Sequence, residues 1–224
     1  MGDLQQELNH ISSYTSKLLR KKFGRGPELC SATFSGNYLI LQIRGFISPM
    51  EEVLLEQGKM ADVTKARASI IAQAIEELRG VVQVTLNVEV ADCYNDWNFP
   101  NNTGVIILAV SGDKPQVQLS YIPQFEAEIA RISQLVQKIP NSIETFVISE
   151  KLLVVNREGI LIPIEKALIS KGFEKELILT KDELEKQYFH RFGKFDEILS
   201  RNVRDIFIDW NLKEDKSLMV FVLQ

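Results

Sequence analysis

Asp96–Val110 reads DWNFPNNTGVIILAV, and Asp209–Leu223 reads DWNLKEDKSLMVFVL. In both stretches Asp-Trp-Asn is followed by a polar turn and then by six apolar residues. The chain contains two tryptophans, and this pattern uses both of them at an offset of 113 residues. Self-similarity at a fixed offset is the mark of an internal repeat. The rest of the chain is therefore expected to repeat as well.

A second pair of segments supports the repeat. Residues 45–58 read GFISPMEEVLLEQG, and residues 159–172 read GILIPIEKALISKG, at an offset of 114. The positions shared by the two copies are Gly45, Pro49, Glu51, Leu54 and Gly58, which match Gly159, Pro163, Glu165, Leu168 and Gly172. The sequence therefore predicts a tandem duplication, with one unit at residues 1–113 and a diverged second unit at residues 114–224.

Each unit is predicted to have the element order α-β-β-α-β-β, from helical spacing of apolar residues and from β-rich runs around turn residues. In the first unit we expect a helix near 4–23, a hairpin of 29–35 with 38–46, a helix over 51–78, and a hairpin of 82–94 with 105–110. In the second unit we expect a helix near 125–136, a hairpin of 143–149 with 152–155, a helix over 184–199, and a hairpin of 203–209 with 218–223. The fold class is thus α+β. Each unit should be an antiparallel sheet with helices on one face, and a pseudo-two-fold axis should relate the units.

Glycine, proline and tryptophan mark the ends of these elements. We expect the first helix to end at Gly24, with Pro27 preventing its continuation. Pro49 and Pro163 suit a first helical turn, where a missing N–H is harmless. We interpret the two tryptophans, Trp97 and Trp210, as packing beside strand ends, with a binding role as the alternative.

The bulk properties predict a packed protein without nucleic-acid binding. Hydrophobic residues make up 45% of the chain, charged residues 25%, and the net charge is −4. Nucleic-acid binding usually needs a basic face. No apolar run approaches the roughly 20 residues that span a bilayer, and the first residues lack the apolar core of a secretory signal. We therefore expect a cytoplasmic protein, with Cys30 and Cys93 as buried thiols.

No catalytic motif stands out in the sequence. His10 and His190 lack a ligand-type partner at helical spacing, so no metal site is predicted. No phosphate-binding loop, nucleophile elbow or dinucleotide-binding glycine pattern is present. Glu51 and Glu165 recur, and we interpret them as carboxylates that complement the positive end of a helix dipole. The sequence thus predicts neither an enzyme nor a cofactor.

The most conspicuous polar feature is a basic patch, Arg20, Lys21, Lys22 and Arg25 together with Gly26. One interpretation is that these cations complement the negative C-terminal end of the first helix. The other is a docking surface for an anion, an acidic partner or anionic lipid head groups. The corresponding segment of the second unit has a single cation, Lys138.

Residues 23–58 carry a resemblance to a known family. They read FGRGPELCSATFSGNYLILQIRGFISPMEEVLLEQG. This resembles the MpsC-like family, a bacterial domain long catalogued without a function. Its pattern is a helix, a G-[RK]-G-P loop, a hairpin, a glycine, and a T/S-P-x-E turn into a helix. The matching residues are Gly24, Arg25, Gly26, Pro27, Gly45, Ser48, Pro49 and Glu51.

The family name refers to a sodium-translocating, membrane-potential-generating system linked to inorganic-carbon uptake and cation transport. The resemblance therefore implies a non-enzymatic accessory or regulatory protein beside a membrane transporter complex, cytoplasmic or peripheral to the membrane. The second unit departs from the family pattern at the G-[RK]-G-P loop.

Two other functional hypotheses remain open. Symmetric folds often bind small molecules at interfaces, so the chain is alternatively a sensor with an anion or nucleotide bound between the units. An enzyme with an unfamiliar site is the third reading. Because open sheets leave edges that tend to pair, we also expect either an intrachain pseudo-dimer or a homo-oligomer.

Overall fold

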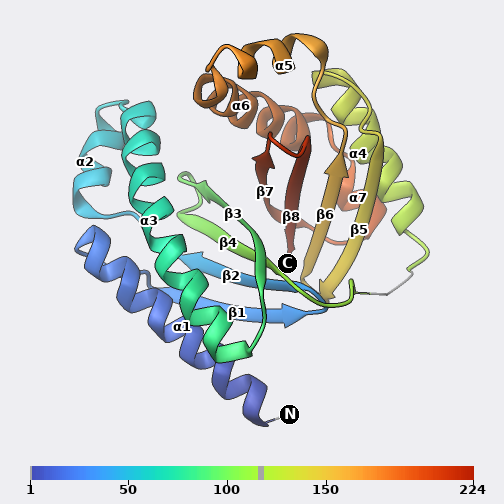
Figure 1. The fold of residues 1–224 in the computed structure, drawn as a ribbon. Helices are drawn as coiled ribbons and strands as arrows, with labels where there is room; N and C mark the ends of the chain where they lie inside the picture. Colours follow the sequence, from blue (N-terminus) through green and yellow to red (C-terminus); the bar gives the residue numbers. More distant parts are fainter. Residues whose placement is uncertain (1, 116–118) are drawn as a thin grey trace. The chain divides into compact units, whose positions relative to one another are not determined.

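The computed structural model describes residues 2–115 and 119–224 (Figure 1). The chain divides into two compact units, residues 1–113 and residues 114–224.

The first unit is a four-stranded antiparallel sheet with three helices. Its strand order is β1-β2-β4-β3, so the two hairpins meet through their second strands. Its elements are α1 (Gly2–Phe23), β1 (Leu29–Ser35), β2 (Tyr38–Arg44), α2 (Pro49–Glu56), α3 (Met60–Leu86), β3 (Val90–Asn98) and β4 (Thr103–Val110).

The second unit repeats this topology, with the strand order β5-β6-β8-β7. Its elements are α4 (Ile122–Val136), β5 (Ser142–Ser149), β6 (Leu152–Glu158), α5 (Pro163–Ser170), α6 (Glu174–Phe192), α7 (Phe195–Leu199), β7 (Val203–Asn211) and β8 (Lys216–Leu223). The prediction of two repeated α+β units, each with an antiparallel sheet and helices, is confirmed. The two-fold relation between the units stays a prediction.

Three predicted boundaries were wrong. In the first unit the helix expected over 51–78 is divided into α2 and α3, because Gly58, with a φ of +72°, follows the end of α2. In the second unit the helix expected over 184–199 is divided between α6 and α7, and a further helix, α5, precedes them and is followed by Gly172 with a φ of +86°. Residues 82–86 were expected in a strand but complete α3, where Val82 lies on the buried face and Asn87 ends the helix in a left-handed conformation. The strands expected to end at residues 94 and 209 continue through Asp-Trp-Asn, so that β3 ends at Asn98 and β7 at Asn211.

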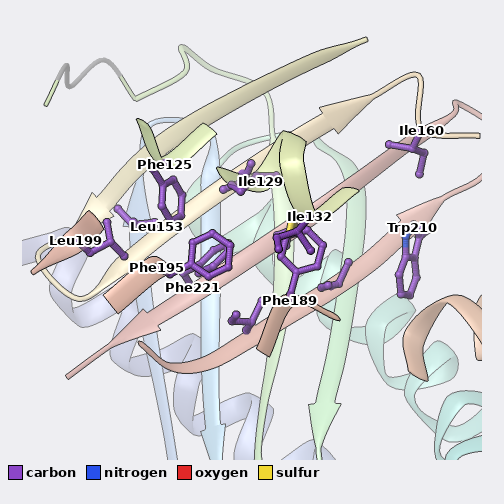
Figure 2. Packing of buried hydrophobic residues seen from close by; sticks show 14 of the residues in the cluster. Phe125, Ile129, Ile132, Leu153, Ile160, Phe189, Phe195, Leu199, Trp210 and Phe221 are labelled. Atoms are coloured by element: carbon purple, nitrogen blue, oxygen red, sulfur yellow. The ribbon is translucent and has the colours of Figure 1, made fainter. Parts of the chain in front are cut away.

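Alternate strand residues and one face of each long helix form the core of a unit. In the first unit, Leu39 and Leu41 of β2 pack with Ile71 and Leu78 of α3. The second unit has a more aromatic core (Figure 2). There the Phe221 ring lies 4.9 Å, centroid to centroid, from the ring of Phe125 and equally far from that of Phe195.

The two repeated sequence blocks are hydrogen-bonded to each other within each unit. In the first unit the Asn102 carbonyl accepts from Gly45 N–H at 2.9 Å, and Asn102 Oδ1 accepts from Phe46 N–H at 2.7 Å. Asp215 takes the same position in the second unit and accepts from Gly159 N–H. Gly45 has a φ of +66°, and a Cβ there would lie 2.4 Å from the Glu28 side chain. The glycine block and the Asp-Trp-Asn hairpin therefore recur together because each completes the other.

Candidate functional site

The first unit holds a buried ion pair between α2 and α3. Arg67 donates from Nε to Glu51 Oε1 and from a terminal nitrogen to Glu51 Oε2, both at 2.8 Å. Glu51 Oε2 also accepts from the backbone N–H and the hydroxyl of Ser48, which is the N-cap of α2. The pair therefore caps α2 and fastens it to α3. Such a bidentate pair is both short and directional.

Three aromatic rings enclose the Arg67 guanidinium. Its central carbon lies 4.3 Å from the ring centroid of Phe23, 4.2 Å from that of Phe46 and 4.6 Å from that of Trp97. The side chain is 2% exposed. Burial lowers the pKa of Arg67, and the hydrogen bonds and charge of Glu51 oppose that shift. We call Glu51, Arg67 and the three rings the arginine centre.

The second unit has a lysine at the equivalent place. Lys181 stands 114 residues after Arg67, just as Glu165 stands 114 residues after Glu51. Its ammonium donates to Glu165 Oε1 at 3.0 Å and to Gln137 Oε1 at 2.6 Å, and it lies 3.1 Å from Glu185 Oε1. An ammonium has three N–H donors, and these three oxygens can satisfy all of them.

A second cation joins this group of charges. Arg157 donates to Glu185 Oε2 at 2.6 Å and to the Ser217 hydroxyl at 2.8 Å. Trp210 donates its indole N–H to Glu185 Oε1 at 3.1 Å. Burial raises the pKa of Glu185, but the charges of Arg157 and Lys181 outweigh it, so the pKa is lowered. We call Arg157, Glu165, Lys181, Glu185 and Trp210 the lysine centre.

The repeated tryptophan contacts a buried charged group in both units. Trp97 does so through its ring, and Trp210 through its indole N–H. In the first unit Trp97 lies over Gly104 in the neighbouring strand, where a Cβ would come within 2.4 Å of the ring. In the second unit the residue paired with Trp210 is Ser217, and its hydroxyl accepts from Arg157. Packing, the favoured interpretation of the tryptophans, agrees with these contacts.

Glu51 and Glu165, expected only to complement helix dipoles, bind buried cations that were not predicted. Each glutamate lies 16 residues before its buried cation, Arg67 or Lys181. That shared spacing was a usable signal, because the offset of 114 continues past Gly58. The other two charges of the lysine centre had no such signal, since Ile43 and Ile71 occupy the positions of Arg157 and Glu185 in the first unit.

The charged groups of both centres stabilise the fold by pairing with each other. Every charged group in them is at most 8% exposed and is bound to an opposite charge. A hollow of about 470 Å³ lies elsewhere in the second unit, beside α4 and α7. Its Glu128 carboxylate already accepts from Arg131 and from the backbone N–H of Lys194. Among the described residues, no group of three or more His, Cys, Asp or Glu side chains is placed to hold a metal ion.

The basic patch is half neutralised within its own unit. Lys22 lies 2.6 Å from Glu77 of α3, and Arg25 lies 3.8 Å from Glu28. Arg20 and Lys21 are exposed, and among residues 2–115 and 119–224 neither has an ion pair. Gly26 packs against Arg20, because a Cβ there would lie 3.2 Å from its Nε.

The glycine and prolines predicted to mark helix ends lie at or beside the ends of helices. α1 ends at Phe23, directly before Gly24, and Pro27 lies in the link to β1. Pro49 and Pro163 are the first residues of α2 and α5, as predicted.

Both cysteines are free and partly buried. Burial raises the pKa of Cys30 to about 11, with a smaller opposing effect from a hydrogen bond to Ser16, and burial also raises the pKa of Cys93. They are therefore weak nucleophiles at neutral pH.

Comparison with known protein families matches residues 4–111 and 122–224 to the family described as Na+-translocating membrane potential-generating system (MpsC). The two matches cover both units, so the chain belongs to this family and contains two copies of its domain. No curated protein and no solved structure matches the chain. Within the described part of the chain, no helix combines the length and the apolar character needed to cross a bilayer.

Proposed function

We propose that this protein is a non-enzymatic accessory or regulatory component of a membrane system that moves ions or inorganic carbon. The observation that carries the proposal is the family match, which extends over both units. The description of the family names a sodium-translocating system that generates a membrane potential. The chain itself would act beside the membrane, by contact with a transporter subunit.

The distribution of charge supports this role. One charged pair that recurs in both units, Glu51 with Arg67 and Glu165 with Lys181, holds helices together inside each unit. The cations left for an external partner include Arg20 and Lys21, which extend from the last turn of α1. Docking on an acidic or anionic surface would therefore start from these two residues, with Lys22 and Arg25 contributing when their partners are displaced.

The test is a pull-down with the tagged chain from solubilised membranes of the native host, followed by mass spectrometry. We expect enrichment of an ion-transporter subunit. The variant Arg20→Glu/Lys21→Glu should lose it. The matched control is Lys151→Glu/Lys213→Glu, which changes the net charge equally at two exposed lysines of the second unit.

Two outcomes would contradict the proposal. Equal capture by the wild type and by the Arg20→Glu/Lys21→Glu variant would exclude the basic patch as the docking surface. Enrichment of soluble proteins alone would separate this chain from the membrane system. The hypothesis of a sensor that binds an anion or a nucleotide would then be preferred. It is tested by a thermal-shift screen with nucleotides, bicarbonate and phosphate.

A further inference from the structure

Strand β1 lies at an edge of the sheet of the first unit and is paired on one side only, with β2 (Figure 1). The other edge strands are β3 in the same sheet, and β5 and β7 in the sheet of the second unit. An edge strand presents backbone N–H and C=O groups that can pair with another chain. Proteins usually protect such an edge with bulges, charges or covering groups.

The strands β3, β5 and β7 are protected in the same three ways. Each has a break in its register with the neighbouring strand, and each carries at least one charged residue. In each, a side chain from a helix also bonds to the backbone of the strand: Arg79 to the Ala91 carbonyl, Glu126 to the Thr145 N–H, and Asp196 to the Val203 N–H. A further strand would have to displace these contacts.

Strand β1 has none of these protections. Its seven residues, LCSATFS, carry no charge, and its register with β2 is regular from Leu29 to Ser35. Within residues 2–115 and 119–224, no side chain is hydrogen-bonded to its backbone. Leu29 is 48% exposed, and the other six residues are half-buried. The same edge is therefore open in the first unit and closed at β5 in the second.

The register shows which backbone groups of β1 point away from β2. The Val110 N–H donates to the carbonyl of Asn37, the residue directly before β2. Successive residues of a strand bond to opposite sides, so every second residue of β2, starting with Tyr38, bonds to β1. Its partners in β1 are Ser35 and every second residue before it. The N–H and C=O groups that point outward therefore belong to Cys30, Ala32 and Phe34.

We propose that β1 pairs with β1 of a second copy of the chain, antiparallel, with the two-fold axis at Ala32. Ala32 is the middle residue of the strand, so this register places Ala32 opposite itself and Cys30 opposite Phe34. Every outward backbone group is then used, because each of these pairs exchanges two hydrogen bonds. The proposal concerns the first unit alone and is independent of the proposed function.

The side chains of β1 favour a second copy over an unrelated extended segment, because they are complementary to themselves in size. Each large side chain would meet a small one: Phe34 opposite Cys30, and Leu29 opposite Ser35. Ser31 would lie opposite Thr33, and such hydroxyl pairs are favourable across strands.

Neither charge nor packing opposes the pairing. Glu28, the residue before the strand, would lie opposite Gly36, which has no side chain. Cys30, Ala32 and Phe34 pack on the core of the first unit but are only partly buried. Helix α1 presents a small residue beside them, Ser16, which is hydrogen-bonded to the Cys30 thiol. Pairing would therefore bury apolar area that a single copy leaves exposed.

The test is sedimentation velocity of the full chain over a range of protein concentrations. We expect a weak, concentration-dependent dimer, because one pair of short strands buries less than the roughly 1,000 Å² of a stable interface. Ala32→Pro removes an outward N–H that β2 does not use, and proline is accepted on an edge strand whose N–H faces solvent. It should raise the dimer Kd by about tenfold or more, since the central backbone bonds are lost.

Two double variants at the same two positions separate pairing from folding. In Ser31→Lys/Thr33→Lys, like charges would face each other across the axis, and the dimer Kd should rise by about tenfold or more. In Ser31→Glu/Thr33→Lys, opposite charges would face each other, and the Kd should be at or below that of the wild type. Urea unfolding checks that the first unit of each variant is folded.

Three results would overturn the proposal. The first is a wild type that stays monomeric, which would leave the edge to an extended segment of another protein. The second is an unchanged Kd for a folded Ala32→Pro variant. The third is an equal Kd for the two double variants, and this comparison decides alone if Ala32→Pro does not fold.

Discussion

Replacing Arg157 and Glu185 together by isoleucine should destabilise the second unit less than the two single replacements do in sum. The first unit shows that the fold accepts this exchange, since Ile43 and Ile71 occupy the equivalent positions there and are 2% and 1% exposed. Arg157 and Glu185 are each 1% exposed and are joined at 2.6 Å. Removing one partner of such a pair leaves the other as a buried charge.

The magnitudes follow from what each variant leaves behind. Breaking a buried ion pair costs about 3–5 kcal/mol. Glu185→Ile belongs at the upper end, because Arg157 then keeps the hydroxyls of Ser133 and Ser217 and the Phe189 ring but loses its carboxylate partner. Arg157→Ile belongs at the lower end, because Glu185 keeps Lys181. In the double variant the remaining cost is chiefly the unpaired indole N–H of Trp210, about 1–3 kcal/mol.

The assay is equilibrium urea unfolding of the four chains, all in a Trp97→Phe background so that Trp210 alone reports on the second unit. We expect a coupling free energy of at least about 3 kcal/mol between the two sites. Lys181 should stay paired throughout, because Glu165 and Gln137 are untouched. Additive losses, with the double variant as unstable as the sum of the singles, would refute the view that pairing is what makes these buried charges tolerable.

Two further predictions concern packing and pH. Gly104→Ala should destabilise the first unit by about 1–3 kcal/mol, since its Cβ would lie 2.4 Å from the Trp97 ring. The control Gly80→Ala, whose Cβ would have no atom within 4 Å, should be neutral or stabilising. Equal urea midpoints for the two variants would contradict the tight packing at Gly104. Burial raises the pKa values of Glu185 and Asp215, but the lowering effect of their cationic neighbours is larger. Both pKa values are therefore depressed in the folded chain. Their stabilisation is therefore complete above the unfolded values of about 4 and is lost as the pH falls through the folded values; a urea midpoint of the second unit that does not change below about pH 4 would contradict this.

The repeat and the element types could be predicted from the sequence because they depend on local spacing. Apolar residues at helical or alternating spacing identify a buried face without knowledge of what covers it. The Asp-Trp-Asn stretches located the second hairpin of each unit, and the glycine blocks located the prolines that begin α2 and α5. The boundaries failed where this signal is weak. Residues 82–86 are apolar enough for a strand, yet they complete α3, with Val82 on its buried face and Val84 84% exposed.

The buried charges were decided by tertiary structure. Sequence spacing shows that Glu51 begins a helix, but not that Arg67 of the next helix meets it inside a cage of rings from α1, the loop after β2, and β3. The same holds for the basic patch, where Lys22 is neutralised by Glu77 of α3. An apolar face can be recognised locally because any apolar neighbour will cover it. A buried charge needs one partner at one distance, and that partner is chosen only when distant segments pack together.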